Sequence, residues 1–89
     1  MDMALLNRLK DIAISDSGFI FDPYSGGTFN TNETGRFILR LLKEGNGMEV
    51  IQSEIGRHFI MSGEDLKSDI YEFINLLKEA QLLPKNFKF

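Results

Sequence analysis

Few residues in the chain have the types and spacing that chemistry requires. His58 is the only histidine and there is no cysteine, which excludes a thiol nucleophile and a cysteine-based metal site. No serine and acid accompany His58 in the pattern of a catalytic triad, and a histidine near a helix end is favourably placed on the helix dipole. The sequence therefore predicts no catalytic residue, no cofactor and no enzymatic activity.

Three aspartates, Asp11, Asp16 and Asp22, are spread over two predicted turns. A calcium-binding loop needs a denser and more regular spacing of acids, so we interpret them as turn and solvent residues and predict no metal site. The pair Gly26-Gly27 joins two predicted strands and no Lys-Ser/Thr follows it, which indicates a turn and not a phosphate-binding loop.

Length and charge narrow the class of protein further. The 89 residues make one domain, and a 43% hydrophobic content with eight Phe is enough for a core. The net charge of −3 argues against a nucleic-acid partner, which normally meets a basic surface. The first residues include an acid and no long apolar run, so they do not form a signal peptide, and no stretch approaches a membrane span. We expect a cytoplasmic protein without a membrane partner.

Three short runs, at 11–15, 19–22 and 28–31, have the residue types of strands and are separated by turns at 16–18 and 23–27. Short turns of this kind favour an antiparallel meander. In the third run Phe29 is the single large apolar residue and should point inward, so that Thr28 and Asn30 point outward. Residues 1–9 predict a frayed helix or an extended arm, 10–83 the domain, and 84–89 a mobile tail.

Three helices are predicted after the strands. The first begins at the N-cap Asn32 and stops at Gly45, the second runs from 47 or 48 to about 59, and the third runs from 62 to about 81 behind a capping box that opens at Ser62. Three strands followed by three helices predict an α+β, winged-helix-like domain with a three-stranded antiparallel sheet.

The third strand and the third helix could form a binding groove. A strand at a sheet edge offers unpaired backbone groups to another chain. The apolar arc of the third helix, from Leu76 through Leu66 to Ile74, is about 160° wide, whereas one-sided packing needs about 100°. The excess fits either a groove wall or a well-buried helix. The helix also carries five acids against two lysines, which DNA phosphates would repel and which basic side chains of a guest peptide could pair with.

Three functions remain open at this stage. The groove favours a non-catalytic peptide-binding domain that adds a guest as a strand. A winged-helix DNA-binding or regulatory domain is an alternative that predicts salt-sensitive DNA binding. A homodimerisation module that uses the same edge strand is the other alternative.

The run from Phe19 to Gly45, with Asn32-Glu-Thr-Gly35 opening its helix and Leu-Leu near its end, resembles the PqqD-like family, and the similarity covers roughly residues 10–83. One departure is Gly47, which stands where a Thr or Ser N-cap is common.

The resemblance implies a winged-helix-like domain that recognises the leader of a ribosomally made precursor peptide and presents it to a modifying enzyme, often a radical SAM protein. It also implies where the leader would lie. The strand residues would be Thr28, Phe29, Asn30 and Thr31, and the helix residues would be Asp69, Ile70, Phe73, Ile74 and Leu77.

Overall fold

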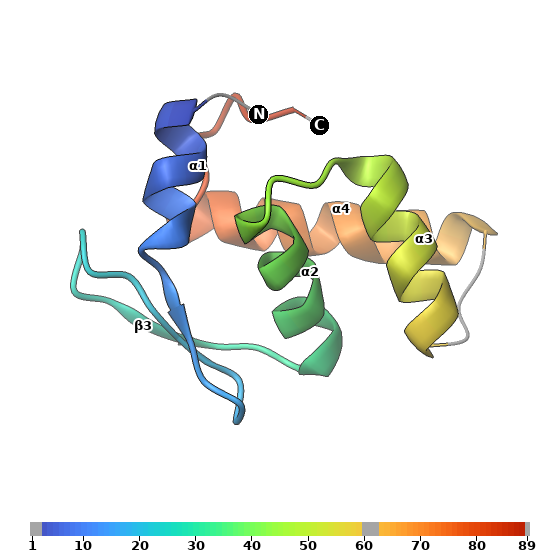
Figure 1. The fold of residues 1–89 in the computed structure, drawn as a ribbon, viewed down its shortest axis with the longest axis horizontal. Coiled ribbons are helices and arrows are strands. Elements are labelled where there is room, and N and C mark those ends of the chain that lie inside the picture. Colours follow the sequence, from blue (N-terminus) through green and yellow to red (C-terminus); the bar gives the residue numbers. More distant parts are fainter. Residues whose placement is uncertain (1–2, 60–62, 89) are drawn as a thin grey trace.

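The computed structural model of the chain describes residues 3–59 and 63–88 and is an α+β domain (Figure 1). In chain order its elements are α1 (Met3–Lys10), β1 (Ala13–Ile14), β2 (Phe19–Phe21), β3 (Thr28–Asn30), α2 (Glu33–Lys43), α3 (Met48–Phe59) and α4 (Gly63–Glu79). The predicted order of three strands and then three helices is confirmed. A fourth helix, α1, precedes the sheet, and the winged-helix label stays a prediction.

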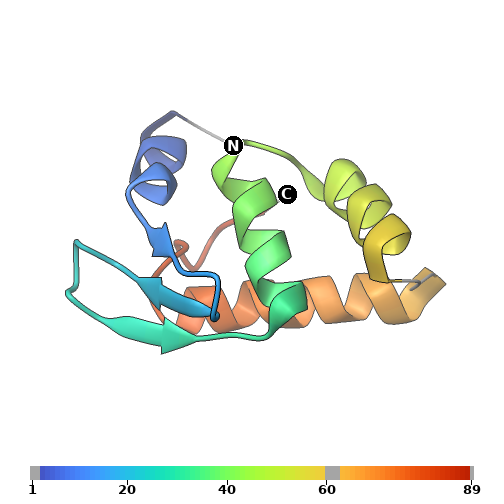
Figure 2. The same cartoon turned by 60° about the horizontal axis from the view of Figure 1, so that its bottom comes forward.

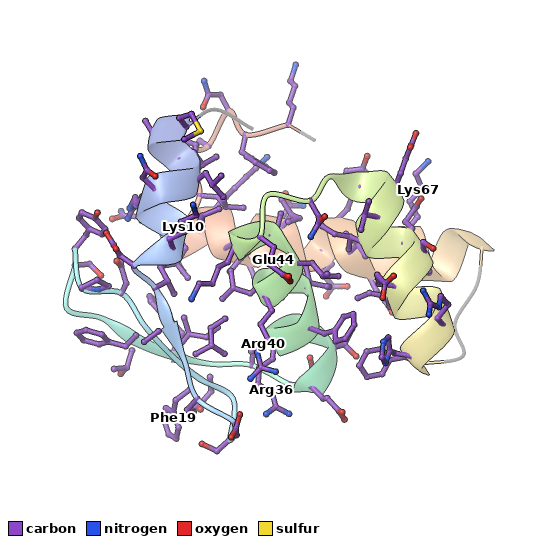
Figure 3. The ribbon with its side chains drawn as sticks, viewed as in Figure 1. Lys10, Phe19, Arg36, Arg40, Glu44 and Lys67 are labelled. Carbon is purple, nitrogen blue, oxygen red and sulfur yellow. The ribbon has the colours of Figure 1, made fainter. Side chains whose placement is uncertain are left out.

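The sheet is a three-stranded antiparallel meander with the order β1-β2-β3. Ile20 in the middle strand lies opposite Ile14 on one side and Phe29 on the other, and these three side chains face the core. Phe29 therefore points inward, as predicted. Phe19 and Phe21 alternate to the outer face, where they are 53% and 43% exposed, and Phe19 points away from the helices (Figure 3).

The core lies between the sheet and the helices, and α4 extends along one side of the molecule under the others (Figure 2). It is built from aliphatic side chains of the helices, of the α1–β1 connection, of β2 and of the segment after α4, together with one aromatic ring: Leu9, Ile12, Ile20, Ile38, Leu39, Leu42, Ile51, Ile55, Leu66, Ile70, Ile74, Leu77, Leu82, Leu83 and Phe87. Both ends of the chain thus contribute to it.

Both terminal segments are better packed than the sequence suggested. Leu9 of α1 is completely buried, so the first residues form a helix docked on the body and not an extended arm. Phe87 is only 8% exposed, and its backbone N–H donates to the Pro84 carbonyl at 3.0 Å. The prediction of a mobile tail is wrong for this part of 84–89. Burial of the Phe87 ring against the core stabilises the docked conformation relative to a free tail.

Asp22 corrects the interpretation of the turn acids, because it is completely buried. Its carboxylate accepts hydrogen bonds from the Tyr24 backbone N–H and the Ser25 hydroxyl, both at 3.0 Å, and forms an ion pair with Arg8 at 3.4 Å. Arg8 also donates to the Gln81 carbonyl at 2.8 Å. One buried acid therefore ties the β2–β3 turn to α1, and through Arg8 to the end of α4.

The helix ends follow the predicted signals where the structure describes them. The Asn32 side chain accepts from the Gly35 N–H at 2.8 Å, and Gly45 follows α2 with φ +88°, the left-handed conformation that glycine allows. The predicted cap Ser62 lies outside the described residues. Within 3–59 and 63–88, no helix combines the length and apolarity needed to cross a membrane.

Candidate functional site

The candidate site begins at the open edge of β3, which pairs with β2 on one side only. Two hydrogen bonds flank the β2–β3 ladder, from Asp22 N–H to the Gly27 carbonyl and from Thr31 N–H to the Gly18 carbonyl, both at 3.0 Å. Because antiparallel residues alternate between facing the partner strand and facing away, these bonds set the direction of every backbone group in β3.

Between those two bonds, Phe29 takes the same direction as Gly27 and Thr31, toward β2. Thr28 and Asn30 alternate with them, so their N–H and C=O groups point to the open edge. Their side chains are exposed on the outer face of the sheet. β3 therefore offers two backbone donor–acceptor pairs at its open edge, one from Thr28 and one from Asn30, with the spacing that an added strand requires.

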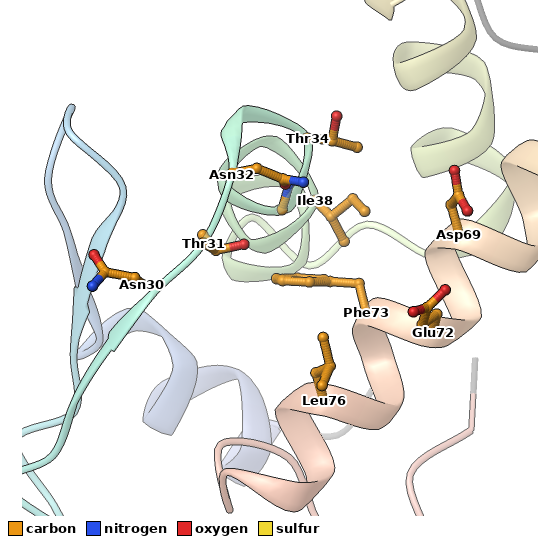
Figure 4. A pocket seen from close by; sticks show the side chains of 10 residues that line it. Asn30, Thr31, Asn32, Thr34, Ile38, Asp69, Glu72, Phe73 and Leu76 are labelled. Atoms are coloured by element: carbon orange, nitrogen blue, oxygen red, sulfur yellow. The ribbon is translucent and has the colours of Figure 1, made fainter.

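A groove runs between this edge and α4. It consists of two adjoining hollows of 430 and 350 Å³ that share Asn30, Thr31, Phe73 and Leu76, and we call them together the β3–α4 groove. The first hollow is completed by Asn32, Thr34, Gly35, Ile38, Asp69 and Glu72 (Figure 4). The second is completed by Ile20, Phe29, Leu77, Glu79, Ala80 and Leu82.

Gly35, in the first turn of α2, makes the close packing at the groove possible. A Cβ atom on this residue would lie 2.0 Å from the Thr31 Oγ1 atom and 2.7 Å from the Phe73 ring. Only a residue without a side chain lets β3 and α4 approach α2 this closely. The Asn32 cap to Gly35 fixes the same turn, so the Asn-Glu-Thr-Gly segment shapes the groove wall.

The predicted site residues divide into three groups. Phe29, Asn30, Thr31, Asp69, Phe73 and Leu77 line the groove. Thr28 does not line it, but belongs to the open edge. Ile70 and Ile74 line neither hollow and are buried in the hydrophobic core, whereas Leu77 belongs to the core and also lines the second hollow.

The sequence reasoning left out Leu76, which lines both hollows and is 54% exposed. Together with Phe73, which also lines both hollows, Leu76 gives the groove an apolar wall beside the open strand. The sequence does contain a signal for Leu76, because this residue lies at one end of the wide apolar arc of the helix. Glu72 was also left out, although its four-residue spacing from Leu76 puts both on one side of the helix.

The groove is acidic. Its lining holds the carboxylates of Asp69, Glu72 and Glu79 and no lysine, arginine or histidine. None of the three carboxylates forms an ion pair within the part of the chain that the structure describes. A bound peptide with a positive side chain would meet uncompensated negative charge here.

His58, the only histidine of the chain, lies outside the groove. It is more than half exposed on α3, 3.9 Å from the Glu54 carboxylate, with its ring centroid 4.6 Å from that of Phe37. Among the described residues, no three His, Cys, Asp or Glu side chains come together as a metal site would require. The surroundings of His58 are those of a helix-end residue whose ring lies tilted against an aromatic ring.

These features define a small α+β domain with an open edge strand beside a helix-lined acidic groove. Residues 18–83 match the family described as Coenzyme PQQ synthesis protein D (PqqD), and the chain belongs to this family. The match confirms the resemblance drawn from the sequence. It begins after β1, so α1 and β1 precede the matched segment. Neither a curated protein nor a solved structure matches the chain.

Proposed function

We propose that this protein is a non-catalytic peptide-binding domain that recognises the leader of a ribosomally synthesised precursor peptide. The leader adds as a strand to β3 in the cytoplasm, and the domain presents it to a modifying enzyme of the radical SAM type. The observation that carries the proposal is the direction of the Thr28 and Asn30 backbone groups, which point out of the sheet beside the β3–α4 groove. Membership of the PqqD family supports a role in peptide recognition.

The groove supplies what the backbone cannot. Backbone hydrogen bonds give affinity for any extended chain, and side-chain pockets give specificity. Phe73, Leu76 and Leu77 provide an apolar wall, and the acids of α4 provide charge. The net charge of −3 and the acidic groove oppose the DNA-binding alternative, because phosphates would be repelled.

A titration would test the proposal. The isotope-labelled domain is mixed with the leader half of a short peptide encoded beside a radical SAM gene in the same genome. We expect amide shifts at Thr28, Asn30 and along α4. Shifts restricted to α3 and α1 would overturn the proposal. Sedimentation without peptide would reveal a homodimer that uses the same edge.

Substitution of Asn30 sharpens the test. Asn30→Pro removes the N–H that points to the open edge, a position where proline does not break the existing ladder. We expect peptide affinity to fall about tenfold, because the hydrogen bond from the Asn30 N–H to the guest strand is lost. The control is Asn30→Ala, which removes the side chain and keeps the N–H. Equal affinities for the two variants would contradict strand addition.

A further inference from the structure

Five groove residues of α4, together with Ala80 directly after it, form two parallel rows. Residues four apart lie one above the other on a helix, and the rows are Asp69, Phe73 and Leu77, and Glu72, Leu76 and Ala80. Both rows read acid, apolar, apolar from the start of the helix toward its end. Apart from Glu79, the residues on this side of the groove therefore repeat one chemical pattern twice.

The spacing of these rows matches that of a strand. Four helical residues advance about 6 Å along the axis, and two strand residues advance about 6.6 Å. A guest strand that lies on the open edge of β3 directs every second side chain to one face. We call each pair of neighbouring residues from the two rows a level: Asp69 with Glu72, Phe73 with Leu76, and Leu77 with Ala80. Three guest side chains, at positions i, i+2 and i+4, would each contact one level.

The acidic level has a defined place along β3. Asp69 and Glu72 share their hollow with Asn32 and Thr34, beyond the end of β3, whereas Leu77 and Ala80 share theirs with Phe29. A guest antiparallel to β3, the more stable arrangement, would meet the carboxylates first and the apolar levels afterwards.

The two carboxylates of this level lack a cation. Asp69 and Glu72 are exposed, three residues apart on one helix side, and form no ion pair among the described residues. Like charges at this spacing repel each other. Glu79, which lies on neither row, adds a third carboxylate to the groove. A positive guest side chain would relieve the repulsion and gain two partners.

We propose that the β3–α4 groove selects a guest strand with a lysine or arginine followed, two and four residues later, by apolar side chains. The proposal rests on the function proposed above and adds the chemical class of the guest. The cation lies between Asp69 and Glu72, and the apolar residues pack on Phe73 and Leu76 and then on Leu77 and Ala80.

Three synthetic peptides test the pattern on the isotope-labelled domain. The first is Ser-Lys-Thr-Leu-Thr-Val-Ser, and the second replaces its lysine with glutamate. The third is the first peptide in reversed order, Ser-Val-Thr-Leu-Thr-Lys-Ser. We expect the first to bind about tenfold more tightly than the second, since two exposed charge pairs each change affinity a few-fold. It should also bind more tightly than the third.

A charge exchange completes the test. Glu72→Lys should weaken the lysine peptide and strengthen the glutamate peptide. The matched control is Glu49→Lys, which makes the same change of charge on α3, outside the groove, and should leave the ratio of the two affinities unchanged.

The outcomes separate this proposal from the one on which it rests. Equal affinities of the first two peptides, with shifts at Thr28 and Asn30, would overturn the cation requirement and leave strand addition standing. Shifts at the outer face or on α3 alone, or none with any peptide, would overturn strand addition and the guest pattern together.

Discussion

The two edges of the small sheet are treated in opposite ways. At the β1 edge the chain uses its own cations: Lys43 of α2 donates to the Ile12 carbonyl, and Arg40 pairs with Asp16 at 3.3 Å. At the β3 edge the backbone groups of Thr28 and Asn30 are open, and the carboxylates of the neighbouring β3–α4 groove form no ion pair among the described residues. Figure 3 shows Arg40 on α2, between Arg36 and Glu44.

The difference shows how a three-stranded sheet can leave one edge strand open to a partner strand while its other edge is protected from pairing. Lysine beside an edge strand is a known protection against unwanted pairing. The β1 edge has that protection and only two residues, whereas the β3 edge has neither. Under the proposed function, a guest strand is thereby directed to the β3 edge.

The largest expected effect comes from the residue that holds the hairpin of the open edge. Asp22→Ala removes three hydrogen-bonded partners from a fully buried carboxylate site, and we expect a loss of about 2–4 kcal/mol in the free energy of unfolding. Urea unfolding measures it. The control Asp16→Ala removes only the exposed pair with Arg40 and should cost less than about 1 kcal/mol. Similar losses for both variants would refute the structural role of Asp22.

The second effect concerns the wall of the groove. In Gly35→Ala the new methyl group overlaps Thr31 and Phe73, so we expect destabilisation of about 1–3 kcal/mol from overpacking, with weaker binding of the lysine peptide. Gly47→Ser is the control, because a Cβ there meets no atom within 4 Å and serine is a good N-cap. Thermal unfolding compares the two. An unchanged melting temperature in Gly35→Ala would show that the groove wall is looser than described.

A smaller effect is expected at the protected edge. Lys43→Met removes the donor to the Ile12 carbonyl and should cost about 0.5–1.5 kcal/mol, with more self-association by sedimentation velocity because the β1 edge is now open. Lys67→Met is the control, on α4 far from the sheet (Figure 3). If both variants self-associate equally, Lys43 does not protect the edge.

The smallest effect links the β2–β3 turn to the segment before β1. The Tyr24 hydroxyl donates to the Asp11 carboxylate at 2.7 Å, and this hydrogen bond raises the pKa of Tyr24 above its usual 10.0. A raised pKa in the folded state means that the stabilisation is present below pH 10 and is lost as the pH rises through the folded value.

Absorbance titration of tyrosinate in a Tyr71→Phe background isolates Tyr24. We expect Asp11→Ala to lower the titration midpoint of Tyr24 toward the usual value, because the Asp11 carboxylate that accepts the hydrogen bond from the phenol is removed. A midpoint that does not move would show that the bond is not formed in solution.

Local signals explain what could be predicted from the sequence. The cap at Asn32, the stop at Gly45 and the inward Phe29 depend on neighbouring residues alone, and all three are found. The burial of Asp22 could not be predicted, because its ion-pair partner Arg8 lies fourteen residues earlier and an aspartate before a proline is usually a turn residue.

The candidate site shows the same limit. A helix with a wide apolar arc uses part of it for the core and part for a groove, and periodicity does not say where the boundary falls. Ile70 and Ile74 lie on the core side and Leu76 on the groove side. Only the position of β3 beside the helix decides between them.

Gly35 carries a consequence for comparisons between relatives. The Asn-Glu-Thr-Gly segment determines the packing of the scaffold, since Gly35 lets Thr31 and Phe73 approach α2 closely. It does not determine which peptide binds. Chains that share the segment should therefore differ in their guests through the two rows of α4. Under the guest pattern proposed above, exchange of those six side chains between two such domains would transfer the guest preference while the scaffold stayed the same.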